Sequence, residues 1–199
     1  MIKIINKNKL EPYLFFYKLL EDANNQKQDP INAICISSFN KKDNEVNSRL
    51  VNLRYLDDEE WTFFSNYKSQ KAEDFIDHQQ ISALLFWPII NVQIRMKAKI
   101  SISPDELSDK HFRERSISKN ILAISSKQSQ KISSYDDVVR NYKEIQESDL
   151  DKTKRPKYWG GYTFKPYYFE FWEGHNSRLN KRLIFEYTKT NWNKYYLQP

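Results

Sequence analysis

The sequence has only three glycines, one cysteine and three histidines among its 199 residues. Nucleotide-binding loops of the GxGxxG or GxxxxGK[ST] type need closely spaced glycines, and Gly160, Gly161 and Gly174 cannot build either one. Cys35 is the single cysteine, so one chain can form neither a disulfide nor a cysteine-rich zinc or iron–sulfur site. The histidines are too scattered for an HExxH-type site. We therefore expect no metal centre.

Long apolar segments are also missing. The longest uncharged stretch, residues 81–94, has fourteen residues and contains Pro88, whereas a membrane-spanning helix needs about 20. The N-terminal segment lacks the apolar run of a signal peptide. A single unpaired cysteine suits a reducing compartment. We expect a soluble cytoplasmic protein that does not bind membranes.

Positive charge is in modest excess. Lys and Arg number 32 against 26 Asp and Glu, which gives a formal net charge of +6. Basic and acidic residues are interspersed through most segments, so a nucleic-acid-binding domain is the weakest of the functions considered, and small phosphorylated ligands explain the surplus equally well. The length fits one domain covering residues 1–199.

Apolar periodicity predicts a chain that is β-rich, then helical, then β-rich again. In the first helix Leu14, Tyr17, Leu20 and Ala23 recur at helical spacing. The order favours an α+β fold, an antiparallel barrel with peripheral helices, over alternating βαβ units. The expected strands are 31–38, 46–55, 61–64, 81–87, 92–102, 158–164, 167–172, 183–188 and 192–197, with a hairpin turn at 40–44. The expected helices are 11–27, 70–78 and two or three within 105–148, where a loop is expected near 125–134.

Two short basic segments are candidate anion sites. His111, Arg115 and Lys119 are spaced at i, i+4 and i+8, so they share one face if a helix runs through them. Their other interpretation, which spacing alone favours, is a solvated charged face. Ser69 and Lys71 lie at an expected helix N-terminus, where backbone N–H groups attract anions, although Ser69 also fits an ordinary N-cap.

Segment 158–182 combines all three glycines with Trp159, Trp172 and the cations of residues 178–182. Aromatic rings beside cations suit a planar, phosphorylated ligand, but the two tryptophans fit equally well as core residues of two strands. No Ser/His/Asp or Cys/His triad is present, and no nucleophile is evident.

Seven short motifs stand out along the chain: SRLVNLR (48–54), FFSNYKSQKAEDF (63–75), LLFWPIINVQI (84–94), SKQSQKI (126–132), YWGGY (158–162), FEFWEGHNSRLNKRL (169–183) and YYLQP (195–199). In their order and approximate spacing they resemble the pyridoxamine 5′-phosphate oxidase family of flavoenzymes. The variant SQK and the ending LQP also resemble the related phenazine-biosynthesis oxidases. The resemblance implies an FMN-binding split β-barrel with peripheral helices that acts as a homodimer, with FMN sites shared between subunits.

The resemblance also implies the residues that hold FMN. Arg49 and Lys71 would neutralise its phosphate, and Gln93 would hydrogen-bond the flavin ring. Gln70 stands where the family has a second phosphate-binding Arg, which removes one cation. Further residues implied in the same subunit are Leu50, Val51, Phe64 and Ser65, and those implied from the other subunit are Gln128, Ser129, Trp172 and Arg182.

By the same resemblance, a substrate phosphate would lie among four residues, and these keep or add positive charge relative to the family. Arg178 and Asn180 would flank the substrate over the flavin as the catalytic pair, but Asn180 replaces the family's His and cannot titrate near neutral pH. The four phosphate-site residues are Arg54, His111, Arg115 and Lys119.

The function that follows is FMN-dependent oxidation of pyridoxamine or pyridoxine 5′-phosphate to pyridoxal 5′-phosphate, with O₂ as electron acceptor. FMN would carry the hydride chemistry, which accounts for the missing nucleophile. Two alternatives share the fold. One is an FMN oxidase for another substrate, such as a phenazine-like metabolite. The other is a split-barrel protein that binds FMN or pyridoxal phosphate without turnover, which the changes at Gln70 and Asn180 favour.

Overall fold

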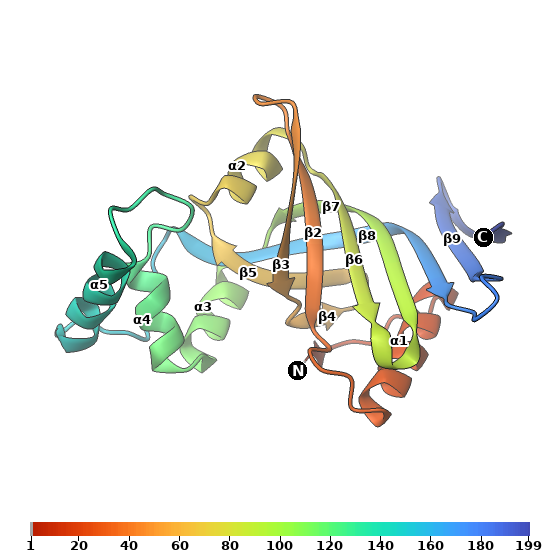
Figure 1. The fold of residues 1–199 in the computed structure, drawn as a ribbon. Helices are drawn as coiled ribbons and strands as arrows, with labels where there is room; N and C mark the ends of the chain where they lie inside the picture. Colours follow the sequence, from red (N-terminus) through yellow and green to blue (C-terminus); the bar gives the residue numbers. More distant parts are fainter. Residues whose placement is uncertain (1) are drawn as a thin grey trace.

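The computed structural model describes residues 2–199, which form a ten-stranded sheet with helices at its edges (Figure 1). The order of strands is β1-β4-β5-β8-β7-β6-β2-β3, and β9 and β10 extend the sheet from β8. The elements are β1 (Lys3–Ile4), α1 (Glu11–Asn25), β2 (Ala33–Asn40), β3 (Glu45–Asn52), β4 (Tyr55–Asp57), β5 (Glu60–Asn66), α2 (Gln70–Asp77), β6 (Gln80–Trp87), a 3₁₀ turn (Pro88–Ile90), β7 (Val92–Ile102), α3 (Asp105–Glu114), α4 (Ile117–Ser125), α5 (Tyr135–Glu147), β8 (Trp159–Glu173), β9 (Lys181–Thr188) and β10 (Asn191–Leu197).

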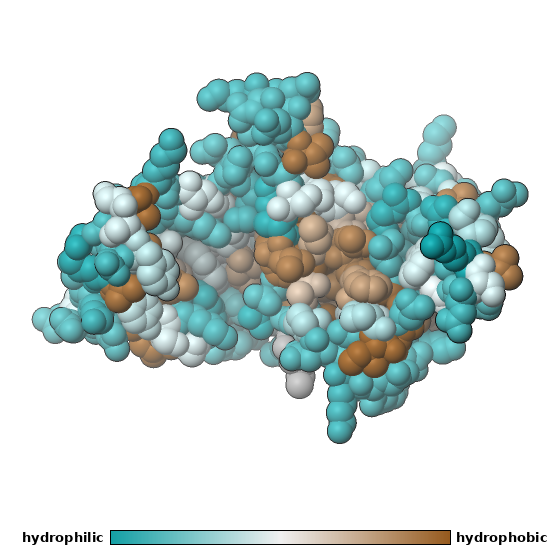
Figure 2. Space-filling view, in the orientation of Figure 1, coloured by the Kyte–Doolittle hydropathy of each residue, from teal (hydrophilic) through white to brown (hydrophobic). Residues whose placement is uncertain are grey.

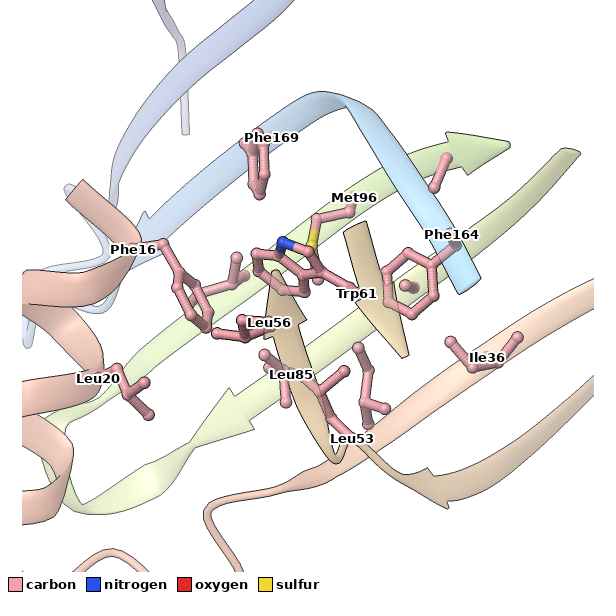
Figure 3. Close-up of a cluster of buried hydrophobic side chains, with 14 of the residues drawn as sticks. Phe16, Leu20, Ile36, Leu53, Leu56, Trp61, Leu85, Met96, Phe164 and Phe169 are labelled. Carbon is pink, nitrogen blue, oxygen red and sulfur yellow. The ribbon is translucent and has the colours of Figure 1, made fainter. Parts of the chain in front are cut away.

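An aromatic core fills the inside of the curved sheet. Trp61 of β5 is fully buried, and the ring of Phe16 from α1 packs 4.5 Å from it, centroid to centroid. Figure 3 shows Phe16 and Leu20 pointing from the helix into this cluster. The buried stripe of α1 differs from the expected one, because Leu14 is half exposed and Tyr13 and Phe16 take the central positions. Burial of these rings is the main force that closes α1 over one end of the barrel.

The hairpin of β2 and β3 follows the expected turn at 40–44. Asn44 takes a left-handed conformation at its end, which asparagine tolerates well. The strand expected at 46–55 is divided in the structure, because β3 ends at Asn52 and β4 begins at Tyr55. Between them Arg54 donates its backbone N–H to the Thr62 carbonyl. The chain therefore changes its pairing partner here, because β3 pairs with β2 whereas β4 pairs with β5.

Strand β8 is one element of 15 residues where two strands were expected. The register with β7 shifts between Lys97 and Ala98, where Tyr168 pairs with Lys97 and Pro166 pairs with Ala98. The extra residue, Tyr167, forms a bulge beside Pro166, which has no N–H to give to the ladder. The bulge lets the strand continue past the proline, so β8 crosses the whole molecule (Figure 1).

Helices α3, α4 and α5 lie together at one side of the barrel, next to the start of β8 (Figure 1). No single helix runs through His111, Arg115 and Lys119, so the condition for a shared helix face is not met: α3 ends at Glu114, and Arg115 has an extended backbone. Ser116 then precedes α4 in the N-cap position. The buried amide of Asn120 holds the break in place by donating to the carbonyls of Phe112 and Lys152, both at 2.9 Å.

Among residues 2–199, no helix is long and apolar enough to cross a membrane.

Candidate functional site

A cleft of about 1100 Å³ lies between the barrel and the helical side of the molecule, and Figure 2 shows the surface hollowed there. Its walls come from β3, the end of β5, the start of α2, and the α3–α4 region. The cleft brings together thirteen of the eighteen residues expected at the site: Arg49, Leu50, Val51, Arg54, Phe64, Ser65, Gln70, Lys71, His111, Arg115, Lys119, Gln128 and Ser129.

Lys71 is a buried cation at one end of the cleft. Its Nζ donates to Ser65 Oγ and Ser69 Oγ, both at 3.1 Å. Burial, together with the charge of Arg49, lowers the pKa of Lys71 to about 8. Ser69 does not cap α2 with its side chain as expected, because its hydroxyl donates to the Asn66 carbonyl at 2.7 Å. The two hydroxyls instead hold the ammonium group in place.

Arg49 lies close to Lys71 and is fixed by a buried network. Its Nη1 donates to Ser38 Oγ at 2.6 Å and to the Ile36 carbonyl at 3.3 Å. Ser38 Oγ donates in turn to Asp74 Oδ2 at 2.6 Å, which lies 3.6 Å from Arg49 Nη2. Asp74 was not identified as part of the site from the sequence, since β2 and α2 meet only in the folded chain.

Three cations, Arg54, Arg115 and Lys119, lie together at the other end of the cleft. Arg115 Nη1 is buried without a hydrogen-bond partner, and its Nη2 donates to the Lys119 carbonyl at 3.3 Å. The guanidinium lies 4.4 Å from the Trp159 ring centre, and burial together with Arg54 lowers the pKa of Arg115 to about 10. None of these three side chains forms an ion pair with a carboxylate in the described chain. This arrangement fits an anionic ligand.

His111 contributes an aromatic ring here rather than a charge. Its ring stacks on Phe64 with 3.8 Å between centroids, and the Tyr55 hydroxyl lies 2.7 Å from its Nδ1. Burial, followed by the charges of Arg115 and Arg54, lowers the pKa of His111 to about 4. The imidazole is therefore neutral at neutral pH, which corrects the expectation that this replacement keeps or adds positive charge.

Gly160 and Gly161 let β8 pass close to the side chains of Tyr67 and Ser103. A Cβ at Gly160 would lie 2.1 Å from Tyr67 Oη, and one at Gly161 would lie 2.5 Å from Ser103 Oγ. Neither position has room for a side chain. The pair thus holds Trp159, the residue before it, beside His111, with the two rings nearly parallel.

Gln128 and Ser129 line the cleft of their own chain, whereas the resemblance implied that they reach it from another subunit. The Gln128 Oε1 accepts hydrogen bonds from Ser65 Oγ and the Asn66 N–H, both at 3.3 Å. The loop that follows α4 folds directly back onto the end of β5, so a second chain is not needed to bring these two residues there.

Gln93, Trp172 and Arg182 lie outside the cleft and form one row across the sheet. Gln93 of β7 pairs with Trp172 of β8, which pairs with Arg182 of β9. Trp159 at the start of β8 lines the cleft, whereas Trp172 lies thirteen residues further along the same strand. One chain therefore presents two separate groups of expected site residues, and Gln93 belongs with the second group.

Arg178 and Asn180 lie in the loop between β8 and β9 and also stay outside the cleft. The Asn180 Oδ1 accepts the His175 N–H at 3.0 Å, and the Arg178 N–H donates to the His175 carbonyl at 2.9 Å. Arg178 has a positive φ of 60°. The side-chain oxygen of Asn180 therefore shapes the loop that presents Arg178.

Two family models match most of the chain. Residues 20–149 match "Pyridoxamine 5′-phosphate oxidase", and residues 159–199 match "Pyridoxine 5′-phosphate oxidase C-terminal dimerisation region".

The chain belongs to the pyridoxamine 5′-phosphate oxidase family.

Relatives of the pyridoxamine 5′-phosphate oxidase family align over nearly the whole chain. The pyridoxine/pyridoxamine 5′-phosphate oxidase of Leptospira interrogans is 30% identical over 95% of this chain and 89% of its own length. The chloroplastic enzyme 1 of Arabidopsis thaliana is 34% identical over 92% of this chain, which spans only 35% of that longer protein. The family consists of FMN-dependent oxidoreductases.

Solved structures show the same fold. PhzG from Burkholderia lata 383, crystallised with tetrahydrophenazine-1-carboxylic acid, superposes with a TM-score of 0.87 at 22% identity, covering 98% of this chain and all of that one. An FMN-binding protein related to pyridoxamine 5′-phosphate oxidase from Nostoc punctiforme gives 0.78 at 13% identity, covering 96% of this chain and all of that one. These likenesses establish the expected α+β split-barrel fold.

Proposed function

We propose that this protein is an FMN-dependent oxidase that converts pyridoxine or pyridoxamine 5′-phosphate to pyridoxal 5′-phosphate, with O₂ as the electron acceptor. The observation that carries the proposal is the pairing of two cationic groups in one cleft: Arg49 and Lys71 at one end, and Arg54, Arg115 and Lys119 at the other. A cofactor with a terminal phosphate and a phosphorylated substrate together match both groups.

The donor set at the first end fits the FMN phosphate. Lys71 is already held by two hydroxyls, and Arg49 is fixed by Ser38 and Asp74, so both cations are ordered before a ligand arrives. The first turn of α2 adds backbone N–H groups and the positive end of the helix dipole. FMN bound there would supply the hydride acceptor, and Leu50, Val51 and Phe64 would line its path through the cleft.

The second end fits a dianionic phosphate better than a single carboxylate. Arg54, Arg115 and Lys119 bring three positive charges, none of them in an ion pair with a carboxylate of the described residues, and the buried Arg115 Nη1 has a free donor. Neutral His111 would contribute a hydrogen bond and a stacking face rather than charge. The three cations repel one another, and the two negative charges of a phosphate would offset more of that repulsion than the single charge of a carboxylate.

A second subunit would complete the site. The match of residues 159–199 to a dimerisation region indicates a homodimer. Figure 2 shows an apolar area in the middle of one face, bordered by hydrophilic surface, and Leu50 and Phe86 are 71% and 52% exposed. In our proposal this face is covered by the partner, and the row of Gln93, Trp172 and Arg182 in one subunit closes the flavin end of the other subunit's cleft.

Arg178 would then approach the substrate from the loop after β8, and Asn180 would hold that loop in shape. Arg178 is exposed in the single chain, and its position at a positive φ is set by the turn that begins at His175. In this role Arg178 orients the substrate carbon toward the flavin, and no side chain needs to act as a nucleophile.

A family oxidase acting on a different substrate is the second candidate. The observation that favours it is the Asn180 side chain, whose oxygen is engaged by the His175 N–H and which cannot carry a titrating proton. In the proposed vitamin B6 reaction, by contrast, the side chain of residue 180 would flank the substrate and face the reacting carbon.

The purified protein tests both candidates. Flavin absorption bands at one FMN per chain, together with hydrogen peroxide formation on adding pyridoxine 5′-phosphate, are the expected result. Full FMN occupancy without oxidation of either phosphate, in both wild type and Asn180→His, would exclude the vitamin B6 reaction and leave the second candidate or a flavin binder without turnover. Colourless protein that takes up no FMN would exclude the vitamin B6 oxidase, the oxidase for another substrate and the flavin binder without turnover.

A further inference from the structure

Glu170 is a buried carboxylate on the side of β8 that faces away from the barrel core. Only 3% of the residue is exposed. Its neighbours Phe169 and Phe171 point to the opposite side of the strand and belong to the hydrophobic core. A carboxylate in such a place requires strong partners, because burial without them would be costly.

Two arginines and a tyrosine supply those partners. Arg182 Nε donates to Glu170 Oε1 at 2.8 Å, Arg95 Nη2 pairs with Oε2, and the Tyr168 hydroxyl donates to Oε2 at 3.3 Å. Burial alone would raise the pKa of Glu170, but the hydrogen bonds from Arg182 and Arg95 outweigh it and lower the pKa. Glu170 is therefore ionised at neutral pH and shared between two cations.

The guanidinium of Arg182 is fixed from two sides. While Nε is held by Glu170, Nη1 donates to the Gln198 carbonyl at 2.9 Å, just beyond the end of β10. These two contacts fix the plane of the Arg182 guanidinium and leave its Nη2 as the nitrogen without a hydrogen-bond acceptor in the described chain. A long side chain that is usually mobile is thus ordered before any ligand binds.

We propose that Glu170, together with the Gln198 carbonyl, is a positioning residue that sets Arg182 for contact with the cofactor bound to the partner subunit. This inference rests on the proposed function, in which Arg182 and its row neighbour Trp172 close the second subunit's cleft. Arg95 is the second cation that keeps Glu170 charged, and it does not itself need to reach the cofactor. Preordering Arg182 reduces the entropy lost when the cofactor binds.

A double-mutant cycle on FMN affinity tests the proposal. Arg182→Ala should raise the Kd for FMN about tenfold, the effect of losing one charge-assisted hydrogen bond. Glu170→Gln keeps the shape but loses the charge, and it should raise the Kd several-fold. The double variant should bind no more weakly than Arg182→Ala, because Glu170 acts through Arg182. Titrations use apoprotein at a concentration where sedimentation shows equal dimer content.

Glu173→Gln is the matched control. Glu173 lies three residues further along β8 and pairs with Lys181 of β9 at 2.9 Å, but both side chains are partly exposed to solvent, unlike Glu170. Its Kd should equal that of wild type. A residue that only stabilised the β8–β9 pairing would lower the unfolding temperature of apoprotein and leave the cycle additive.

The outcomes separate the inference from the function it rests on. Unchanged affinity in Arg182→Ala would remove Arg182 from the cofactor site, which contradicts the proposed shared site and the inference together. Weaker binding in Arg182→Ala with wild-type affinity in Glu170→Gln, or an additive cycle, would overturn the inference alone. If Glu170→Gln does not fold, Glu170→Asp keeps the charge but draws the carboxylate back from Nε, and wild-type affinity in that variant would overturn the inference equally.

Discussion

The imidazole of His111 stacks on the ring of Phe64, with 3.8 Å between centroids and only 9° between planes. The Tyr55 hydroxyl lies 2.7 Å from its Nδ1. The same cleft wall carries three cations, so adding a proton to His111 is opposed by burial and by charge. The ring serves as a neutral wall of the candidate phosphate subsite.

Protonation of His111 should make stability depend on pH in a defined window. Its pKa is lowered from 6.5 to about 4, so the unfolded chain binds this proton more readily than the folded protein does. Stability therefore falls as pH drops from 6.5 toward 4, by up to about 3 kcal/mol. Urea unfolding across this range should show the loss in wild type and a smaller one in His111→Phe. Identical pH dependence in both proteins would mean that His111 titrates normally.

Lys71→Ala should weaken FMN binding by roughly 1.5–3 kcal/mol, because a buried charge-assisted contact is lost. Lys68→Ala is the control, since Lys68 is exposed on the same segment and lies outside the cleft. The pKa of about 8 predicts, in addition, that wild-type affinity declines as pH rises through 8, where Lys71 loses its proton. Fluorescence titration measures both effects. Equal affinity in the two variants would place the cofactor phosphate elsewhere.

Arg115→Ala should raise the KM for pyridoxine 5′-phosphate about ten- to a hundredfold with little change in kcat, because a phosphate contact is remote from the reacting carbon. Arg113→Ala should behave as wild type, since Arg113 is exposed and does not line the cleft. Steady-state peroxide assays give both constants. A fall in kcat at unchanged KM would assign Arg115 to the reacting end of the substrate instead.

Dilution should release flavin if each cleft needs Gln93, Trp172 and Arg182 from a partner. FMN binding and dimerisation are then linked, so free flavin fluorescence should rise at the concentration where sedimentation detects monomers. Trp172→Ala should shift this release to higher protein concentration. A monomer that retains FMN tightly would rule out the shared site.

Local chemistry was enough to predict most strands and to single out Lys71, Arg115 and Lys119 as candidate anion-binding residues, whereas Arg49 and Arg54 entered the candidate site only through the family resemblance. Strand β7 begins and ends where alternation of apolar residues predicts, at Val92 and Ile102, because every second residue from Val92 to Ile100 is buried. The turn after Asn40 and the α4–α5 loop followed from turn residues in the same way. Spacing placed Arg115 and Lys119 on one face only if a single helix ran through both. The helix is broken after Glu114, and the two residues meet through the hydrogen bond from Arg115 Nη2 to the Lys119 carbonyl instead.

Tertiary contacts decided what the sequence alone left open. The break after Glu114 depends on Asn120 reaching two distant carbonyls, and the unbroken β8 depends on a bulge opposite Ala98. The lowered pKa of His111 depends first on its burial and then on the cations that surround it after folding. Charge state and strand continuity are set by neighbours that are far apart in the chain, whereas alternation, turns and residue type are local properties. The sequence therefore determined which groups the site contains, and only the folded sheet determined that one chain presents them in two separate places.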